Sequence, residues 1–177
     1  MDEIDRLTVA RALLMQPVLR AVSRLMPAGA LTALRAEIAA LRDDPITAVL
    51  VNNTVYAMTG GQMAPTTLLG QKTETTPFGR DEAETGRPFK GPETLSAVAH
   101  PQAYLARGTV AQVLRLKNEL KRGLERQLQG HFAFIEALST CPTNWRTNAA
   151  ATWAFLEQDM SSFYRPGEVA VMAGKED

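Results

Sequence analysis

The sequence predicts an α/β fold in which a parallel sheet is flanked by helices. Short apolar runs, at residues 46–51 and 132–138, alternate with longer segments whose apolar residues recur at helical spacing. The run at 46–51 is also β-branched and continuously apolar, as is typical of a strand buried on both faces of a parallel sheet. Strands that alternate with helices in this way are joined by right-handed crossovers, and this pattern defines the fold class.

The first 44 residues are predicted to be helical. Apolar residues at helical spacing in 4–26 indicate two short helical pieces that are interrupted at Pro17. Four arginines make this segment basic and amphipathic, which favours a helix packed on the sheet but also fits a helix on a membrane surface or a partner. A second helix is expected over 30–42, and the following Asp43-Asp44-Pro45 is expected to form the turn that ends it.

An α/β domain is expected over residues 45–164. The loop from 54 to about 92 is far longer than an ordinary connection, and such loops in compact domains are usually functional or partly disordered. After this loop we expect a helix at 93–99, a strand at 103–107, a helix at 110–129, a strand at 132–138 and a helix at 148–160. Residues 165–177 are expected to form a flexible tail, either frayed or draped over a partner.

Composition narrows the class of protein. The chain has 177 residues, of which 45% are hydrophobic and 21% charged, enough for one compact domain with a real core. Its 19 basic and 19 acidic residues give no reason to expect a nucleic acid or an anionic membrane as a partner. The single cysteine excludes an internal disulfide and fits a reducing compartment. No apolar run approaches the roughly 18–20 residues of a membrane span, and the acidic N-terminus argues against a targeting peptide, so a cytoplasmic location is expected.

The end of the first predicted strand has the composition of a cofactor site. The apolar run ends at Asn52 and Asn53, and Thr59-Gly60-Gly61-Gln62 follows shortly afterwards. This arrangement is expected to place carboxamides, a hydroxyl and unencumbered backbone N–H groups at one strand end, where diphosphates and their metal ions bind in open α/β sheets. The two glycines would let the backbone approach a ligand closely.

Two blocks of the sequence carry a resemblance to a known family. The first consists of NNTVYAMTGGQMAPTT and GQKTETTPFGR, and the second is FAFIEALSTCPTNW. In this order and at this separation they resemble the β subunit of 2-oxoacid:ferredoxin oxidoreductases, especially the 2-oxoglutarate type, over residues 45–163. The fold is therefore expected to resemble the C-terminal part of a thiamine-diphosphate-binding fold. The family's N-terminal CPGCG and GDG elements are absent from this sequence.

The resemblance implies a site for thiamine diphosphate and magnesium after the first strand. In the family, the metal is held between the GDG aspartate and the residues just after the strand. Asn53 is thus expected to offer a side-chain oxygen and Val55 a backbone carbonyl, while Asn52 supports the turn. The alternative is that the two asparagines only cap a turn. The residues expected to bind the cofactor are Asn52, Thr59, Gly60, Gly61 and Gln62.

The resemblance also implies which residues lie near the thiamine ring and the 2-oxoacid, but it assigns no catalytic residue. Met58 and Gln62 are expected near the cofactor, although Met58 could instead fill a gap in the core. Lys72 and Arg80 could bind a carboxylate of a 2-oxoacid, or they could lie on a solvated loop face. Glu74 adds a negative charge to the same segment.

The remaining candidate ligands are one cysteine and two histidines. Cys141 matches the family's fourth thiolate ligand to a [4Fe-4S] cluster, which needs four ligands and therefore three thiolates from another polypeptide. Otherwise Cys141 is a small core residue. His100 and His131 have no companion at ligand spacing, so they are expected to be surface or loop residues.

Two functions fit these observations. In the first, the chain is a subunit of a 2-oxoacid:ferredoxin oxidoreductase, which oxidatively decarboxylates a 2-oxoacid to an acyl-CoA and passes electrons to ferredoxin. An α subunit and a chain with the missing β-subunit motifs would complete it, and the isolated chain would not be competent. In the second, the chain is a degenerate or truncated paralogue that keeps a structural or subunit-interaction role. A nucleotide-binding or methyltransferase-like module is disfavoured because no glycine fingerprint follows an early strand.

Overall fold

This computed structural model describes residues 28–172. The two helical pieces predicted within 4–26 and the last five residues of the chain lie outside this range. The chain divides into two compact units, one ending at Ile38 and the other comprising Ala39–Asp177. Helix α2 (Ala28–Arg42) confirms the helix predicted over 30–42, and its last turn belongs to the second unit.

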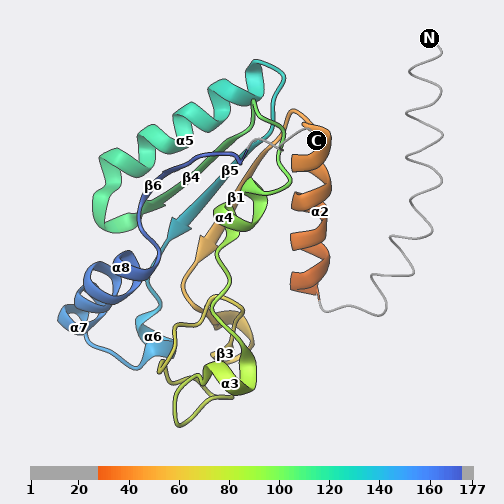
Figure 1. Ribbon diagram of the computed structural model, residues 1–177. Coiled ribbons are helices and arrows are strands. Elements are labelled where there is room, and N and C mark those ends of the chain that lie inside the picture. The colour runs from red at the N-terminus through yellow and green to blue at the C-terminus, as the bar shows by residue number, and fades with distance from the viewer. Residues whose placement is uncertain (1–27, 173–177) are drawn as a thin grey trace. The chain divides into compact units, whose positions relative to one another are not determined.

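The second unit is built on a four-stranded sheet with the order β1-β5-β4-β6. The strands are β1 (Thr47–Asn52), β4 (Tyr104–Thr109), β5 (Ala133–Leu138) and β6 (Gly167–Val169). The first three are parallel, and Asn52 and Thr109 both pair with Leu138, so these strands end level with one another. In Figure 1 the arrowheads of β1 and β5 point towards the loops that carry β3 and α6. Any ligand bound at the carboxyl ends of the strands would therefore meet these loops.

Alternate residues of the central strands face two different helices. On one face, Leu105 and Phe134 belong to a core with Leu95, which lies on α4 (Gly91–Ser96). On the other face, Ile135 packs with Leu116, which lies on α5 (Val113–Leu128), after a short 3-10 turn η2 (Val110–Gln112). The sheet is thus flanked by helices, and the predicted α/β class with a mostly parallel sheet is confirmed.

Short elements fill the two connections at the carboxyl end of the sheet. The long loop after β1 holds a small antiparallel pair and two short helical turns: β2 (Val55–Tyr56), η1 (Ala57–Thr59), β3 (Gln62–Met63) and α3 (Glu82–Thr85). The segment after β5 is helical: α6 (Pro142–Trp145), α7 (Ala149–Ala154), a π-helical turn η3 (Phe155–Met160) and α8 (Ser161–Phe163). The helix expected over 148–160 is therefore confirmed, but its second half is π-helical.

Two expectations are wrong. The first strand is not buried on both faces, because β1 is an edge strand whose Val49 and Val51 are 50% and 64% exposed. The tail from Arg165 is not wholly flexible, because β6 pairs antiparallel with β4 and Val169 packs against the core. Among the described residues, no helix is long and apolar enough to cross a membrane.

Candidate functional site

A buried polar network lies beneath the carboxyl end of the sheet. Arg107 and Glu136 are neighbours on β4 and β5, and both are almost completely buried. Arg107 Nε donates to Glu136 Oε2 at 2.6 Å, and its other two nitrogens donate to the two oxygens of Glu93 at 2.8 and 2.6 Å. The second oxygen of Glu136 accepts from Asn52 Nδ2 at 2.7 Å. Every carboxylate oxygen of the network therefore has a donor, as buried charges require.

The pKa values of the two carboxylates in this network are shifted in opposite directions. Burial raises the pKa of Glu136, despite its bonds to Arg107 and Asn52. Burial would also raise the pKa of Glu93, but the bidentate hydrogen bonds and the charge of Arg107 outweigh it and lower that pKa. One signal for this network was missed in the sequence: a glutamate inside the apolar run FAFIEAL indicates a buried carboxylate that needs hydrogen-bond donors or a cation as partners.

The network fixes the turn that follows β1. Asn52 Oδ1 accepts from the backbone N–H of Thr54 at 2.9 Å, so both ends of this carboxamide are used and Asn52 supports the turn as expected. Thr54 is fully buried at a left-handed φ of 62°. It is held there by Gln71, whose Nε2 donates to Thr54 Oγ1 at 2.8 Å. Asn53 Oδ1 accepts from the Val55 N–H at 3.2 Å, and a carboxamide oxygen has a second lone pair for another partner.

The glycine pair forms a tight turn between β2 and β3. Gly60 and Gly61 have φ values of 111° and 84°, which only glycine adopts readily. Their N–H groups donate to the carbonyls of Ala57 and Tyr56, at 3.3 and 2.9 Å. The expectation of unencumbered N–H groups is therefore wrong, because the turn itself consumes them. Met58 is fully exposed on the same turn, so it does not fill a gap in the core.

Thr59 and Gln62 bond to each other across this turn. Thr59 Oγ1 donates to Gln62 Oε1 at 2.6 Å, and Gln62 Nε2 donates to the Thr59 carbonyl at 2.6 Å. These two of the five residues expected to bind the cofactor therefore lie together at the turn, and their side chains are oriented by each other. Both bonds are solvent-exposed, so a ligand could exchange with them.

The second sequence block packs directly against the first. Trp145 Nε1 donates to the Asn53 carbonyl at 3.0 Å, and Asn144 Nδ2 donates to the Ala57 carbonyl at 3.2 Å. A Cβ on Gly61 would lie only 2.9 Å from Asn144 Oδ1, so glycine is also required for this close approach. Asn144 Nδ2 further lies 3.2 Å from Cys141 Sγ. Asn144 and Trp145 were not predicted as site residues, although both belong to the CPTNW block.

Arg80 does not face a substrate site. Its side chain is buried, with 5% of the residue exposed, and burial lowers its pKa. Its terminal nitrogens donate to the carbonyls of Pro65 (2.8 Å), Thr67 (2.6 Å), Thr85 (3.2 Å) and Arg87 (3.1 Å). The predicted contact between Arg80 and a carboxylate is thus replaced by a structural role, in which Arg80 ties both halves of the long loop together. Lys72 is exposed, and Glu74 forms an ion pair with Arg146.

The end of β1 is where the sequence predicts a magnesium site. Asn53 has an amide oxygen there and Val55 a backbone carbonyl, and hard oxygen atoms are the ligands that magnesium prefers. Within residues 28–172, the one group of three clustered acidic, histidine or cysteine side chains lies elsewhere, at Asp43, His100 and His131. Cys141 is the single cysteine of the chain, so the residues present do not fit an iron–sulfur cluster without three further ligands.

Comparisons with known proteins show which protein family the chain is similar to. Ketoisovalerate oxidoreductase subunit VorA from Methanothermobacter thermautotrophicus is 44% identical over 126 residues, which cover 69% of this chain and 26% of that protein. The 2-oxoglutarate synthase subunit KorB from Archaeoglobus fulgidus is 36% identical over 119 residues, which cover 67% and 41%. The 2-oxoacid:ferredoxin oxidoreductase subunit beta from Saccharolobus solfataricus is 31% identical over 102 residues, which cover 58% and 30%.

These relatives confirm the resemblance to subunits of 2-oxoacid:ferredoxin oxidoreductases, and the chain spans less than half the length of each. A family model described as "Thiamine pyrophosphate enzyme, C-terminal TPP binding domain" matches residues 31–137. The matched region contains the whole of β1, β4 and the glycine turn, and nearly all of β5. The chain therefore belongs to the family of thiamine pyrophosphate enzymes, through their C-terminal TPP-binding domain.

Proposed function

We propose that this chain supplies one part of a thiamine diphosphate site in a 2-oxoacid:ferredoxin oxidoreductase, and that other polypeptides complete the enzyme. The observation that carries the proposal is the meeting of the two sequence blocks at one end of the sheet. The turn at Asn53, the glycine turn and the CPTNW segment are bonded to one another there. A degenerate paralogue with only a structural role would not need this arrangement at a strand end.

The chain's own residues would hold the diphosphate and its metal ion. Asn53 Oδ1 and the Val55 carbonyl would be two oxygen ligands of magnesium, which takes its remaining ligands from phosphates, water and a carboxylate. Asn52 would act through the turn rather than by contact, because its carboxamide is already bonded to Glu136 and Thr54. Thr59, Gly60, Gly61 and Gln62 would line the diphosphate. When bound, thiamine diphosphate supplies the carbon nucleophile that makes decarboxylation of a 2-oxoacid possible.

Lys72 is the remaining candidate for binding the carboxylate of the substrate. It is exposed in the loop that follows the glycine turn, whereas Arg80 is occupied by carbonyl groups. Glu74 lies between Lys72 and this buried arginine in sequence, and its ion pair with Arg146 offsets its negative charge. An anionic substrate would therefore meet less repulsion than the sequence alone suggested.

Cys141 would be one ligand of a [4Fe-4S] cluster whose other three thiolates come from a partner chain. Its thiol lies just beyond the end of β5, where Asn144 orients it, and it is half-buried. Electrons would pass from this cluster to ferredoxin, and the acyl group to coenzyme A. A cytoplasmic location, expected from the sequence, is part of the same proposal.

Exposed apolar side chains near the site would be covered by a partner subunit. Met58 is fully exposed and Phe78 is 96% exposed, and both lie on the loop after β1. Val49 and Val51 are exposed on the edge strand itself. We propose that these exposed apolar side chains contribute to the interface with that partner.

Native mass spectrometry of the untagged protein from its source cells tests the proposal. We expect a complex that contains this chain, a cysteine-rich chain, thiamine diphosphate and iron–sulfur. A cofactor-free monomer or homodimer would contradict it and favour the structural role. Asn53→Ala in the assembled complex should cause loss of magnesium-dependent cofactor retention. Asn118→Ala, on the exposed face of α5, is the matched control and should retain the cofactor.

A further inference from the structure

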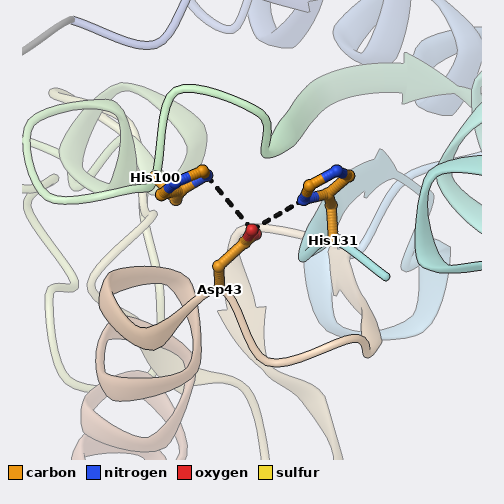
Figure 2. A group of neighbouring side chains, drawn as sticks. All are labelled: Asp43, His100 and His131. Carbon is orange, nitrogen blue, oxygen red and sulfur yellow. Dashed lines mark hydrogen bonds and ion pairs between the residues drawn. The ribbon is translucent and has the colours of Figure 1, made fainter. Parts of the chain in front are cut away.

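Three side chains from distant parts of the sequence meet at the amino end of the sheet, opposite the candidate cofactor site. Asp43 lies between α2 and β1, His100 precedes β4, and His131 precedes β5. Figure 2 shows both imidazole rings pointing towards the same carboxylate oxygen of Asp43. The two rings are nearly parallel, with an interplanar angle of 9° and centroids 6.1 Å apart. The sequence predicted surface or loop positions for both histidines, and they do lie in loops, but they are not without companions.

The backbone holds each of these residues in place. The carbonyl of Ala40, in the last turn of α2, accepts from the N–H groups of Asp43 (3.4 Å) and His100 (3.1 Å). The N–H of His131 donates to the Arg126 carbonyl at the end of α5. Because all three residues are fixed by the ends of regular elements, the cluster is preorganised rather than a chance meeting of mobile side chains.

The polar contacts of the cluster bring three possible ligand atoms together. Asp43 Oδ2 lies 2.7 Å from His131 Nδ1 and 3.1 Å from His100 Nδ1, while Asp43 Oδ1 accepts from the Phe132 N–H at 2.9 Å. His100 Nδ1 also accepts from the backbone N–H of Gln102 at 3.2 Å, and an imidazole nitrogen has a single lone pair, so an ion bound at Nδ1 would replace this hydrogen bond. One carboxylate oxygen and two ring nitrogens thus meet at one point, where a cation could contact all three.

We propose that Asp43, His100 and His131 form a binding site for a divalent transition-metal ion of the zinc class. Two imidazoles and one carboxylate suit zinc better than magnesium or calcium, which take oxygen ligands. The ligand atoms all lie within 4.8 Å of one another. A tetrahedral zinc ion with bonds of about 2.0–2.1 Å needs ligand atoms about 3.3 Å apart, so the distances between ligand atoms would change by at most about 1.5 Å.

The partial exposure of these three side chains leaves room for a water molecule as the fourth ligand of the zinc ion. The side chains of Asp43, His131 and His100 are 16%, 28% and 45% exposed, so water can reach the ion and take the fourth position. Zinc binds only unprotonated ring nitrogens, so any proton carried by a ligating nitrogen would be released to the solvent. The ion would tie the end of α2 to the beginnings of β4 and β5. It would be independent of thiamine diphosphate, because it lies at the other end of the strands.

Equilibrium dialysis of the full-length untagged chain against Zn²⁺, followed by metal analysis, tests this site. We expect one Zn²⁺ per chain, and loss of at least about tenfold in affinity in His100→Ala, His131→Ala and Asp43→Asn. Co²⁺ should give the visible absorption of a four-coordinate ion in the wild type and not in these variants. Asp44→Asn and Cys141→Ser are the matched controls and should bind as the wild type does, since Asp44 is paired with Arg42 and Cys141 lies at the opposite end.

Folding and metal binding can be separated in these variants. Asp43 bonds to the backbone of Phe132, so Asp43→Asn can reduce stability by itself. His100 is nearly half exposed, and circular dichroism should show that His100→Ala folds normally. Any of three results would overturn the proposal: the wild type binds no Zn²⁺, both histidine variants bind Zn²⁺ with unchanged affinity, or Cys141→Ser abolishes Zn²⁺ binding.

Discussion

Replacement of Glu136 by glutamine should be among the most damaging conservative changes in this chain. Glutamine keeps the volume and can still accept from Asn52, but its NH₂ group would face Arg107 Nε, so two donors would meet where an ion pair now stands at 2.6 Å. Removal of one partner from a buried ion pair costs about 3–5 kcal/mol. Glu93 would still compensate the charge of Arg107, so we expect the lower end, about 3 kcal/mol, or about 6–12 °C in Tm for a chain of this size.

Glu93→Gln is the control for this prediction. Its side chain is 39% exposed, and Arg107 would keep its bond to Glu136, so the expected loss is only about 1 kcal/mol. Urea unfolding of both variants at pH 7 measures the difference, and equal m-values would show that the unfolded states are comparable. If Glu93→Gln destabilises the chain as much as Glu136→Gln, the assignment of the main stabilising pair to Glu136 is wrong.

Three glycines give further predictions that separate backbone strain from close packing. Gly61→Ala and Gly70→Ala should each lower the free energy of unfolding by about 1 kcal/mol, because both positions have a left-handed φ. Only Gly61→Ala should also displace Asn144 and lower cofactor retention in the complex. A Cβ at Gly70 would meet nothing within 4 Å. Equal effects on retention would contradict this. Gly123→Ala should lower the free energy of unfolding by about 1–3 kcal/mol, as measured by thermal unfolding, because its Cβ would lie 2.4 Å from Ile135 Cδ1. Adding Ile135→Val, which removes Cδ1, should restore part of this stability. No recovery in the double variant would refute the clash.

The sequence predicts where the strands lie better than it predicts which strands are adjacent in the sheet. The apolar runs at 46–51 and 132–138 locate β1 and β5 to within one residue, because burial of the backbone in a sheet demands such runs. Hydrophobicity does not say which strands flank a given strand, so the exposed edge at Val49 and Val51 was not foreseen. Strand β6 has only three residues, one of them Glu168, and shows no period that could be recognised.

The candidate site shows the same division between local and long-range structure. The turn at Asn52 and Asn53 follows from the side-chain chemistry of asparagine next to a strand end, so it could be predicted. The role of Arg80 depends on carbonyls contributed by both ends of a long loop, and no local pattern encodes that arrangement. For the same reason the meeting of His100 and His131 is visible only once the strands have been placed.

One partner would explain both the open edge of β1 and the missing carboxylate of the proposed magnesium site. A strand added parallel to β1 would cover its open edge and would end beside Asn53, because parallel strands in one sheet end at the same side. A residue just after that strand could therefore supply the carboxylate that the magnesium site lacks. If one segment does both, cofactor binding and subunit association must strengthen each other by the same factor. Asn53→Ala should then weaken association only when thiamine diphosphate and magnesium are present, whereas Val51→Lys should weaken it with or without them.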